Sequence, residues 1–202
     1  SLQFEVRCGR AVIHPDFVMG RDPLLVAEAI ARAKRQGVSE ELLSELDGFT
    51  GAVGIWDSGR PGPVTAFRFD IDCVQVGETS DPAHEANAGG YASQRPNLMH
   101  ACGHDGHLAV GLGVAQWIKD HADQLCGKIK LVFQPAEEGT RGAQPMAESG
   151  ILDDVDFIVC THIGSSVPLH QVAVCTHGYL ATTKLDIYFE GVPAHAGANP
   201  EK

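Results

Sequence analysis

Apolar residues recur at helical spacing in three stretches of the chain. Residues 22–36 begin with Asp-Pro, a capping residue followed by the residue favoured at the first helical position. Residues 39–48 begin with Ser and end with Gly, which is typical of a shorter helix. A third stretch ends near residue 122, and its apolar positions are Leu108, Leu112, Ala115 and Ile118. These patterns predict two helices early in the chain and one buried helix in its middle.

Four further stretches are short and apolar, which is typical of strands. Residues 53–56 and 64–74 are joined by Asp-Ser-Gly-Arg-Pro-Gly-Pro, so we predict a hairpin there. Residues 128–134 and 157–161 have the pattern of buried strands. Strands and helices alternate, which predicts the α/β class, with a sheet flanked by helices.

Three other segments bear on the organisation of the chain. Residues 77–96 are polar and too long for a simple connection, which favours an active-site loop. Residues 184–190 alternate between apolar and polar side chains, as a half-solvated antiparallel strand does. Residues 1–20 show no clear period, and we assign no element to them. We therefore predict one domain over residues 1–180 and the first strand of a second domain over residues 181–202.

Composition and charge exclude several classes of partner. The chain has 202 residues and a formal net charge of −11, which argues against nucleic acid or an anionic membrane surface as its main partner. No apolar run approaches the length of a membrane-spanning helix, and the first residues lack a signal-peptide pattern. The six cysteines show no framework spacing. We expect reduced thiols and a cytoplasmic location.

The segment with the most chemistry is Met-His-Ala-Cys-Gly-His-Asp-Gly-His, residues 99–107. Cys102 and His104 are one residue apart, so both side chains can point to one side of an extended or turning segment, as neighbouring metal ligands do. Any one of these residues could instead be a buried core histidine or cysteine. Together they indicate metal chemistry at the entrance of the predicted helix, where anionic substrates are also favoured.

Charged side chains also stand where three predicted strands end. They are Asp70 and Asp72, Glu137 and Glu138, and His162. Ligands bind at this edge of an open α/β sheet, so we expect these side chains to meet the 99–107 segment in one crevice. Each of them, taken alone, could be a turn residue, a solvated carboxylate or a histidine with a structural partner.

Two adjacent glutamates allow a division of labour in such a crevice. One carboxylate can bind a metal ion while the other accepts a proton from water that the ion activates. A thiolate ligand favours Zn²⁺, whereas carboxylates and imidazoles also accept Mn²⁺.

Five motifs, in this order, resemble the amidohydrolase branch of the M20 metallopeptidase family. They are Arg-Phe-Asp-Ile-Asp at residues 68–72, the cluster at 99–107, Phe-Gln-Pro-Ala-Glu-Glu-Gly at 133–139, His-Ile-Gly at 162–164 and Gly-Val-Pro-Ala-His at 191–195. The resemblance runs from about residue 50 to residue 202. It implies a zinc-peptidase-like catalytic domain and the start of an α+β dimerisation domain.

The resemblance also implies a site for two divalent cations, Zn²⁺ or Mn²⁺. Cys102 would bridge the two ions, and His104, Glu138 and His162 would be further ligands. Family members are longer, and a last metal-binding histidine lies in the part that follows residue 202. We therefore expect these 202 residues by themselves not to catalyse.

The remaining motif residues receive roles from the same resemblance. Glu137 would be the general base and acid, and Asp72 would support the catalytic site from behind the ligands. His195 would bind the substrate or its oxyanion in the site of a dimer partner. His100 and His107 would have structural roles.

The activity implied by the resemblance is hydrolysis of the amide bond of an N-acyl amino acid, with p-aminobenzoyl-glutamate as the first candidate. The alternatives are another N-acyl amino acid deacylase or aminopeptidase of the family, and a catalytically inactive metal-binding fragment. The implied partners are a small-molecule substrate and, in the full-length protein, further subunits in a homodimer or hetero-oligomer.

Overall fold

The computed structural model describes residues 4–164, residues 167–175 and the isolated positions 181, 183, 185, 187, 188 and 190. The chain divides into two units, Ser1–Ser166 and Val167–Lys202. All helices and strands assigned among the described residues lie in the first unit. His195 and part of the predicted strand at 184–190 lie outside the described residues. The predicted domain boundary at residue 180 stays a prediction.

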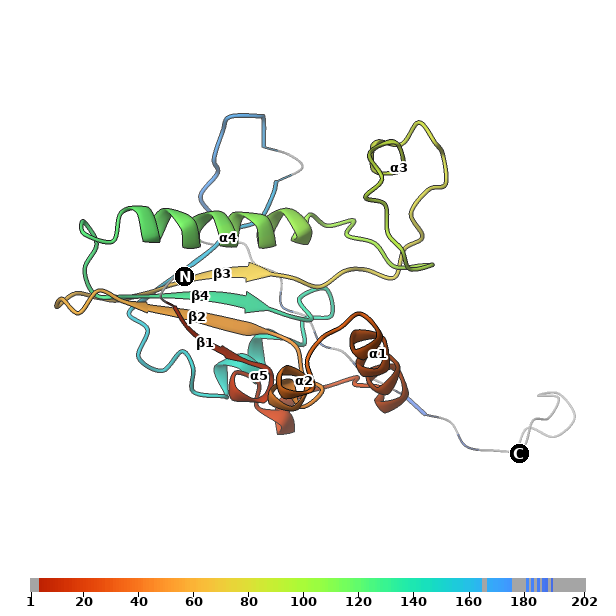
Figure 1. The fold of residues 1–202 in the computed structure, drawn as a ribbon, viewed down its shortest axis with the longest axis horizontal. Helices are drawn as coiled ribbons and strands as arrows, with labels where there is room; N and C mark the ends of the chain where they lie inside the picture. Colours follow the sequence, from red (N-terminus) through yellow and green to blue (C-terminus); the bar gives the residue numbers. More distant parts are fainter. Residues whose placement is uncertain are drawn as a thin grey trace, which may run out of the picture. The chain divides into compact units, whose positions relative to one another are not determined.

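The first unit is built on a five-stranded mixed sheet with the strand order β1-β2-β4-β3-β5 (Figure 1). The strands are β1 (Glu5–Cys8), β2 (Ala52–Asp57), β3 (Val64–Asp70), β4 (Lys128–Gln134) and β5 (Phe157–Cys160). Strand β3 pairs in parallel with both β4 and β5, whereas β2 is antiparallel to its neighbours β1 and β4. The predicted α/β class, with helices flanking a mixed sheet, is confirmed.

Helices cover both faces of this sheet. They are α1 (Pro23–Arg35), α2 (Glu40–Leu46), α3 (Glu85–Gly89), α4 (His104–Asp120) and α5 (Ala143–Ala147), with two 3₁₀ turns at Gly9–Ala11 and Pro15–Phe17. Figure 1 shows α4 on one side of the sheet and α1, α2 and α5 on the other. The predicted caps are confirmed: the Asp22 carboxylate accepts the N–H of Leu24, and the Ser39 hydroxyl accepts that of Leu42.

The predicted hairpin of residues 53–74 is wrong, because β4 lies between β2 and β3. The link from β2 to β3 crosses the amino end of β4 and binds it there. The N–H of Ser58 donates to the carbonyl of Gly127, whose own N–H donates to the carbonyl of Arg60. Two prolines in the link cannot donate the N–H groups that a tight turn uses, and the wider link leaves both strands free to pair with β4.

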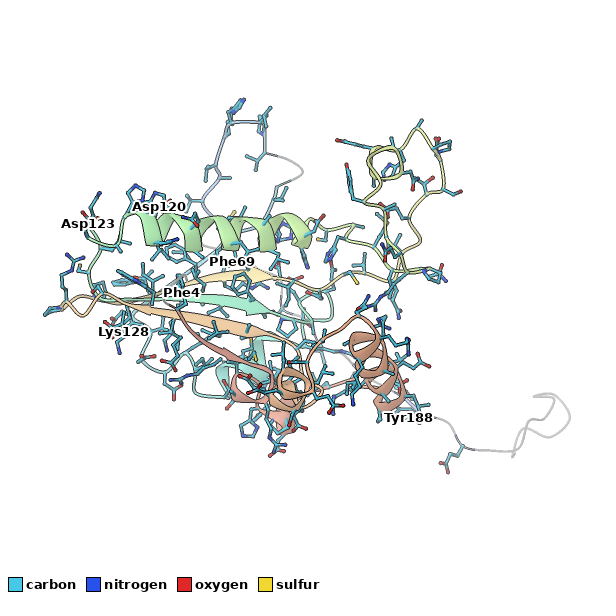
Figure 2. All side chains as sticks on the ribbon, in the orientation of Figure 1. Phe4, Phe69, Asp120, Asp123, Lys128 and Tyr188 are labelled. Carbon is cyan, nitrogen blue, oxygen red and sulfur yellow. The ribbon has the colours of Figure 1, made fainter. Side chains whose placement is uncertain are left out.

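Alternate side chains of the strands enter two hydrophobic clusters, one on each face of the sheet. The cluster under α4 contains Trp56, Phe69, Ala115, Ile118, Ile129 and Leu131. The opposite cluster contains Val12, Ile13, Val53, Ala66, Val132, Met146 and Ile151. Figure 2 shows Phe69 between α4 and the sheet. A Cβ on Gly111 would lie 2.6 Å from the Phe133 ring, so this glycine lets α4 approach the strands closely.

The buried face of α4 differs from the prediction. Leu112 is 58% exposed and Leu108 is 39% exposed, whereas His104, His107 and Gly111 are buried together with Ala115 and Ile118. The buried face includes the histidines because His104 and His107 contact Asp70 at the end of β3. The loop between residues 77 and 96 also holds the short helix α3, which the sequence pattern did not predict.

Two predicted strands need correction. Strand β3 ends at Asp70, and beyond it Val74 pairs with Met99 in an isolated bridge that closes the base of the following loop. Strand β5 is exposed rather than buried, with Phe157 62% exposed. Among the described residues, β5 is an edge strand, so its apolar side chains have no neighbouring strand on one side.

Candidate metal centre

Parallel pairing places the carboxyl ends of β3, β4 and β5 at one edge of the sheet. Helix α4 begins at the same edge, because Asp70 at the end of β3 contacts His104 and His107 in the first turn of α4. The predicted convergence of strand ends and of the 99–107 segment is therefore confirmed. The side chains brought together are Asp70, Asp72, Cys102, His104, His107, Glu137, Glu138 and His162.

His104 is the first residue of α4, and only 1% of it is exposed. Its Nδ1 atom lies 2.9 Å from the backbone carbonyl oxygen of Asp72. A carbonyl oxygen only accepts hydrogen bonds, so Nδ1 carries the proton and Nε2 keeps a lone pair. This backbone contact therefore holds His104 in the tautomer whose Nε2 can bind a metal ion.

The Nε2 atom of His104 is buried and has no hydrogen-bond partner among the described residues. Three carboxylate oxygens surround it, at 3.7 Å from Asp70 and at 3.8 Å from both Glu137 and Glu138. These atoms are all acceptors, and a buried acceptor without a donor costs free energy. The Asp70 oxygen already accepts from His107, and a divalent cation would satisfy Nε2 of His104 together with the two glutamate carboxylates, so the residues present fit a metal ion.

Cys102 and His162 lie beside this group. The Cys102 Sγ atom is 3.5 Å from His162 Nε2, while His162 Nδ1 donates to the carbonyl of Ile163 and leaves Nε2 with its lone pair. Burial, and then the hydrogen bond and charge of Glu138, raise the pKa of the Cys102 thiol. A bound cation reverses this effect, because a thiol that coordinates a metal ion loses its proton.

Asp72 joins the start of α4 to the loop after β4. Its backbone carbonyl accepts from His104, and its Oδ2 atom accepts the backbone N–H of Glu138 at 3.0 Å. Asp72 thus orients two predicted ligands, His104 and Glu138, through hydrogen bonds to atoms that would not bind the cation. This arrangement is compatible with the supporting role predicted for Asp72.

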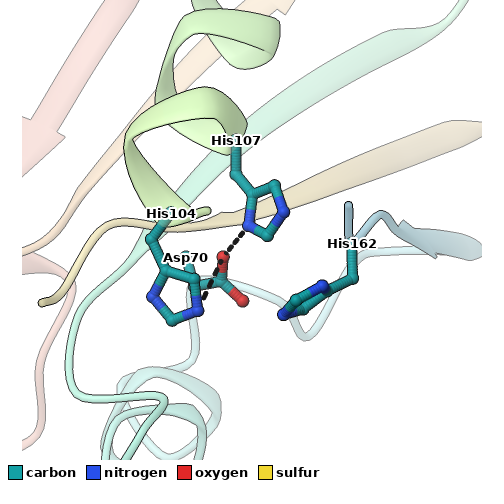
Figure 3. A group of neighbouring side chains, drawn as sticks. All are labelled: Asp70, His104, His107 and His162. Atoms are coloured by element: carbon teal, nitrogen blue, oxygen red, sulfur yellow. Dashed lines mark hydrogen bonds and ion pairs between the residues drawn. The ribbon is translucent and has the colours of Figure 1, made fainter. Parts of the chain in front are cut away.

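Asp70 and His107 form a buried hydrogen bond next to the predicted ligands (Figure 3). Burial raises the pKa of Asp70, but the hydrogen bond from His107 and the charge of Arg68 lower it, and the net pKa is below its ordinary value. The sequence predicted Asp70 in the crevice at the strand end and assigned it no role as a ligand or catalytic residue. A signal was present, because His107 lies one helical turn after His104 and must share its face.

Two of the other predicted site residues, Glu137 and His100, are accessible to solvent. Glu137 has its side chain 35% exposed and one oxygen near His104, so water can reach it. His100 is exposed. His195 lies outside the described residues, so its predicted role in substrate binding stays a prediction.

The model of peptidase family M20/M25/M40 matches residues 66–201. The chain belongs to this family. It is 50% identical over 98% of its length to a homolog of a p-aminobenzoyl-glutamate hydrolase subunit from Haemophilus influenzae, and 45% identical over its whole length to a p-aminobenzoyl-glutamate hydrolase subunit of Escherichia coli. It is also 48% identical over its whole length to an indole-3-acetyl-aspartic acid hydrolase from Enterobacter agglomerans. In each case the match covers 47% of the relative, so the chain spans about half the length of these relatives.

Solved structures give the same assignment. An aminobenzoyl-glutamate utilization protein from Klebsiella pneumoniae superposes with a TM-score of 0.65 at 43% identity, covering 83% of this chain and 36% of that one. A dinuclear metal binding M20 peptidase from Bacillus subtilis superposes with a TM-score of 0.54 at 28% identity, covering 78% of this chain and 41% of that one. The resemblance to the M20 family is confirmed. Among the described residues, no helix has the length and apolar character needed to cross a membrane.

Proposed function

We propose that the protein to which this chain belongs is a metal-dependent amidohydrolase that cleaves p-aminobenzoyl-glutamate into p-aminobenzoate and glutamate. The observation that carries the proposal is the buried Nε2 atom of His104, which has no hydrogen-bond partner among the described residues and lies within 3.8 Å of three carboxylate oxygens. The substrate follows from the relatives whose names contain p-aminobenzoyl-glutamate hydrolase.

We assign Cys102, His104, Glu138 and His162 as ligands of two divalent cations, Zn²⁺ or Mn²⁺. Cys102, His104 and Glu138 support this assignment, because one possible ligand atom from each lies within 4.8 Å of the others. When bound, such ions polarise the amide carbonyl and lower the pKa of water. The thiol favours Zn²⁺ as the resident ion.

Glu137 is the proton carrier in this proposal. Its carboxylate is partly exposed and lies 3.8 Å from His104, so it is close to the site and open to water. It accepts a proton from the attacking water and returns it to the nitrogen of the leaving glutamate. Asp72 keeps His104 and the backbone of Glu138 in place during the reaction. His195 is proposed to bind the substrate in the site of a partner protomer.

The cytoplasm stays the predicted compartment on the sequence grounds given above. The Escherichia coli relative is named as one subunit of its hydrolase, which favours an assembly, and we propose a homodimer or hetero-oligomer. A second candidate substrate class is an indoleacyl-aspartate, because the indole-3-acetyl-aspartic acid hydrolase, at 48% identity, lies between the two other relatives at 50% and 45%. Both substrates are aromatic N-acyl derivatives of an acidic amino acid.

The test is a comparison of the two substrates on the full-length protein. After dialysis against a chelator, activity should be lost, and Zn²⁺ or Mn²⁺ should restore it at about two ions per chain. Release of p-aminobenzoate from p-aminobenzoyl-glutamate should exceed release of indole-3-acetate from its aspartate conjugate in kcat/KM. Full activity in the metal-free protein would contradict the proposed mechanism, and faster cleavage of the indole conjugate would contradict the proposed substrate.

A further inference from the structure

A chain of hydrogen bonds and ion pairs links the ends of the three parallel strands behind the predicted ligands. Gln134 at the end of β4 accepts from Arg68 Nε at 2.9 Å, and Arg68 lies 2.7 Å from Asp70 Oδ2. The other oxygen of Asp70 bonds His107 Nδ1, and His107 Nε2 lies 2.7 Å from the backbone nitrogen of Ile163. The chain therefore runs from β4 through β3 and α4 to the segment after β5.

The direction of each bond follows from the donors available. The N–H of Ile163 can only donate, so His107 Nε2 is an acceptor and carries no proton. His107 Nδ1 then carries the proton and donates a hydrogen bond to Asp70. Both ring nitrogens are used within the protein, which leaves His107 without a lone pair for a cation although it lies among the predicted ligands.

The residue that precedes Ile163 is the predicted ligand His162. The pairing of β5 with β3 ends at Cys160 opposite Arg68, two residues before His162, so the sheet itself does not fix this ligand. The backbone of Ile163 is held on both sides, because its N–H bonds His107 and its carbonyl bonds His162 Nδ1. The rings of His107 and His162 also pack edge to face, with 4.5 Å between their centroids.

We infer that His107 is a positioning residue, which sets the backbone of Ile163 and thereby directs His162 Nε2 toward Cys102 and the cation. The inference rests on the proposed function, since it takes His162 as a ligand. Asp70 and Arg68 hold the imidazole in the tautomer that this task requires. Groups that orient metal ligands in this way change metal affinity by about 10- to 100-fold when they are removed.

Two substitutions of His107 separate its two hydrogen bonds. In His107→Asn the amide nitrogen can still donate to Asp70 from the place of Nδ1, but nothing reaches the N–H of Ile163. In His107→Gln the longer side chain can place its oxygen near the position of Nε2, where it accepts from Ile163, but the donor to Asp70 is lost. We expect His107→Asn to weaken Zn²⁺ binding by about 10- to 100-fold and His107→Gln to weaken it by only a few-fold.

The measurements use the purified full-length protein. Zn²⁺ affinity is obtained by competition with a chelator, and the visible absorption spectrum of the Co²⁺-substituted protein reports the ligand geometry. The spectrum of His107→Asn should shift, while that of His107→Gln should stay close to the wild type. Circular dichroism and the urea midpoint of each variant show whether it is folded. If neither variant folds, the nitrogen chemical shifts of His107 in the labelled wild-type protein decide: an unprotonated Nε2 supports the inference and a protonated one overturns it.

The outcomes separate this inference from the proposed function. Equal affinity and spectra in both variants and the wild type would overturn the role of His107 alone. Equal losses in both variants would also overturn it, because the effect would then not depend on an acceptor for Ile163. A His162→Ala variant that binds Zn²⁺ as tightly as the wild type would remove the ligand assignment, and the inference with it.

Discussion

The two ends of helix α4 differ in whether their polar groups have hydrogen-bond partners. At the carboxyl end, the guanidinium of Arg60 donates to the backbone carbonyls of Ala122, Asp123 and Leu125, just beyond the last turn. At the amino end, the capping position is Gly103, and no side chain caps the helix there. The first turn instead buries His104, whose Nε2 atom has no hydrogen-bond partner among the described residues.

The carboxyl end of the helix therefore contributes to the free energy of unfolding, and the amino end contributes to the proposed metal site. The Arg60 cation at the carboxyl end of α4 satisfies carbonyls of the turn that follows the helix and interacts favourably with the helix dipole. Buried acceptors without donors cost free energy and persist where a ligand completes them. Substitutions at the amino end should therefore alter metal binding and turnover, and substitutions at the carboxyl end should alter the free energy of unfolding.

The largest effect is expected at the amino end, from Glu137 and Glu138. Both lie 3.8 Å from His104 Nε2, so distance alone does not distinguish their roles. Glu137→Gln should keep its metal and lose turnover by about 10² or more, roughly 2.7 kcal/mol of transition-state stabilisation, because it removes a positioned proton acceptor. Glu138→Gln should lose metal. Metal analysis and kcat on the full-length protein check both.

The exposed Glu41→Gln on α2 is the matched control for this pair and should leave metal content and kcat unchanged. The same metal content and the same residual rate in Glu137→Gln and Glu138→Gln would contradict the division of labour between the two glutamates.

An intermediate effect is expected at the carboxyl end, from Arg60→Ala. This change removes the donor to three backbone carbonyls, and we expect a loss of about 1–2 kcal/mol in the free energy of unfolding, because Arg60 is exposed and water replaces part of the contact. Urea unfolding measures the loss. The control Arg7→Ala breaks an exposed ion pair with Glu5 and should cost no more than about 0.5 kcal/mol. A change in metal content in Arg60→Ala would show that the two ends are not independent.

The smallest effect concerns Asp57, at the same end of the sheet as Arg60. The hydrogen bond from the N–H of Gly59, followed by the hydrogen bond from Lys128 and then its charge, holds the pKa of Asp57 below its ordinary value. A lowered pKa stabilises the folded state above the unfolded pKa of about 3.9, and this stabilisation is lost as the pH falls through the folded pKa. Asp57→Asn should therefore destabilise the protein at pH 7, and the difference from the wild type should shrink toward acid pH.

Urea midpoints at pH 7 and pH 3 test this sign, with the exposed Asp123→Asn as the control for loss of one surface carboxylate. A difference between Asp57→Asn and the wild type that grows as the pH falls would mean that the carboxylate of Asp57 is not the stabilising form.

Local signals in the sequence predicted several elements closely. The caps at Asp22 and Ser39 marked the starts of α1 and α2, and the apolar run of residues 128–134 has the bounds of β4. These signals depend on residues close in the sequence, so tertiary contacts change them little. The convergence of the strand ends was predictable for a related reason, because parallel strands share an edge.

Features that depend on distant neighbours were predicted poorly. The hairpin of residues 53–74 was wrong because β4, more than 50 residues further along the chain, occupies the place between β2 and β3. The buried side of α4 was misplaced because the helix turns its histidines toward the strand ends, which leaves Leu112 exposed. Strand β5 has the composition of a buried strand and yet lies at the sheet edge among the described residues.

The sequence by itself determined the class of the fold and the family, and it predicted a set of side chains as ligands of a cation. The resemblance had already separated His104, as a ligand, from His107, as a structural residue, but only the tertiary structure gives the physical reason, since the two are three residues apart on one helix and equally buried. The backbone carbonyl of Asp72, 32 residues away, accepts the hydrogen bond from the Nδ1–H of His104 and leaves Nε2 with a free lone pair, whereas the N–H of Ile163, 56 residues away, donates to Nε2 of His107 and occupies its lone pair. Whether one ring nitrogen of an imidazole can bind a cation depends on the hydrogen bonds that the two nitrogens make, and only folding brings those partners to the ring.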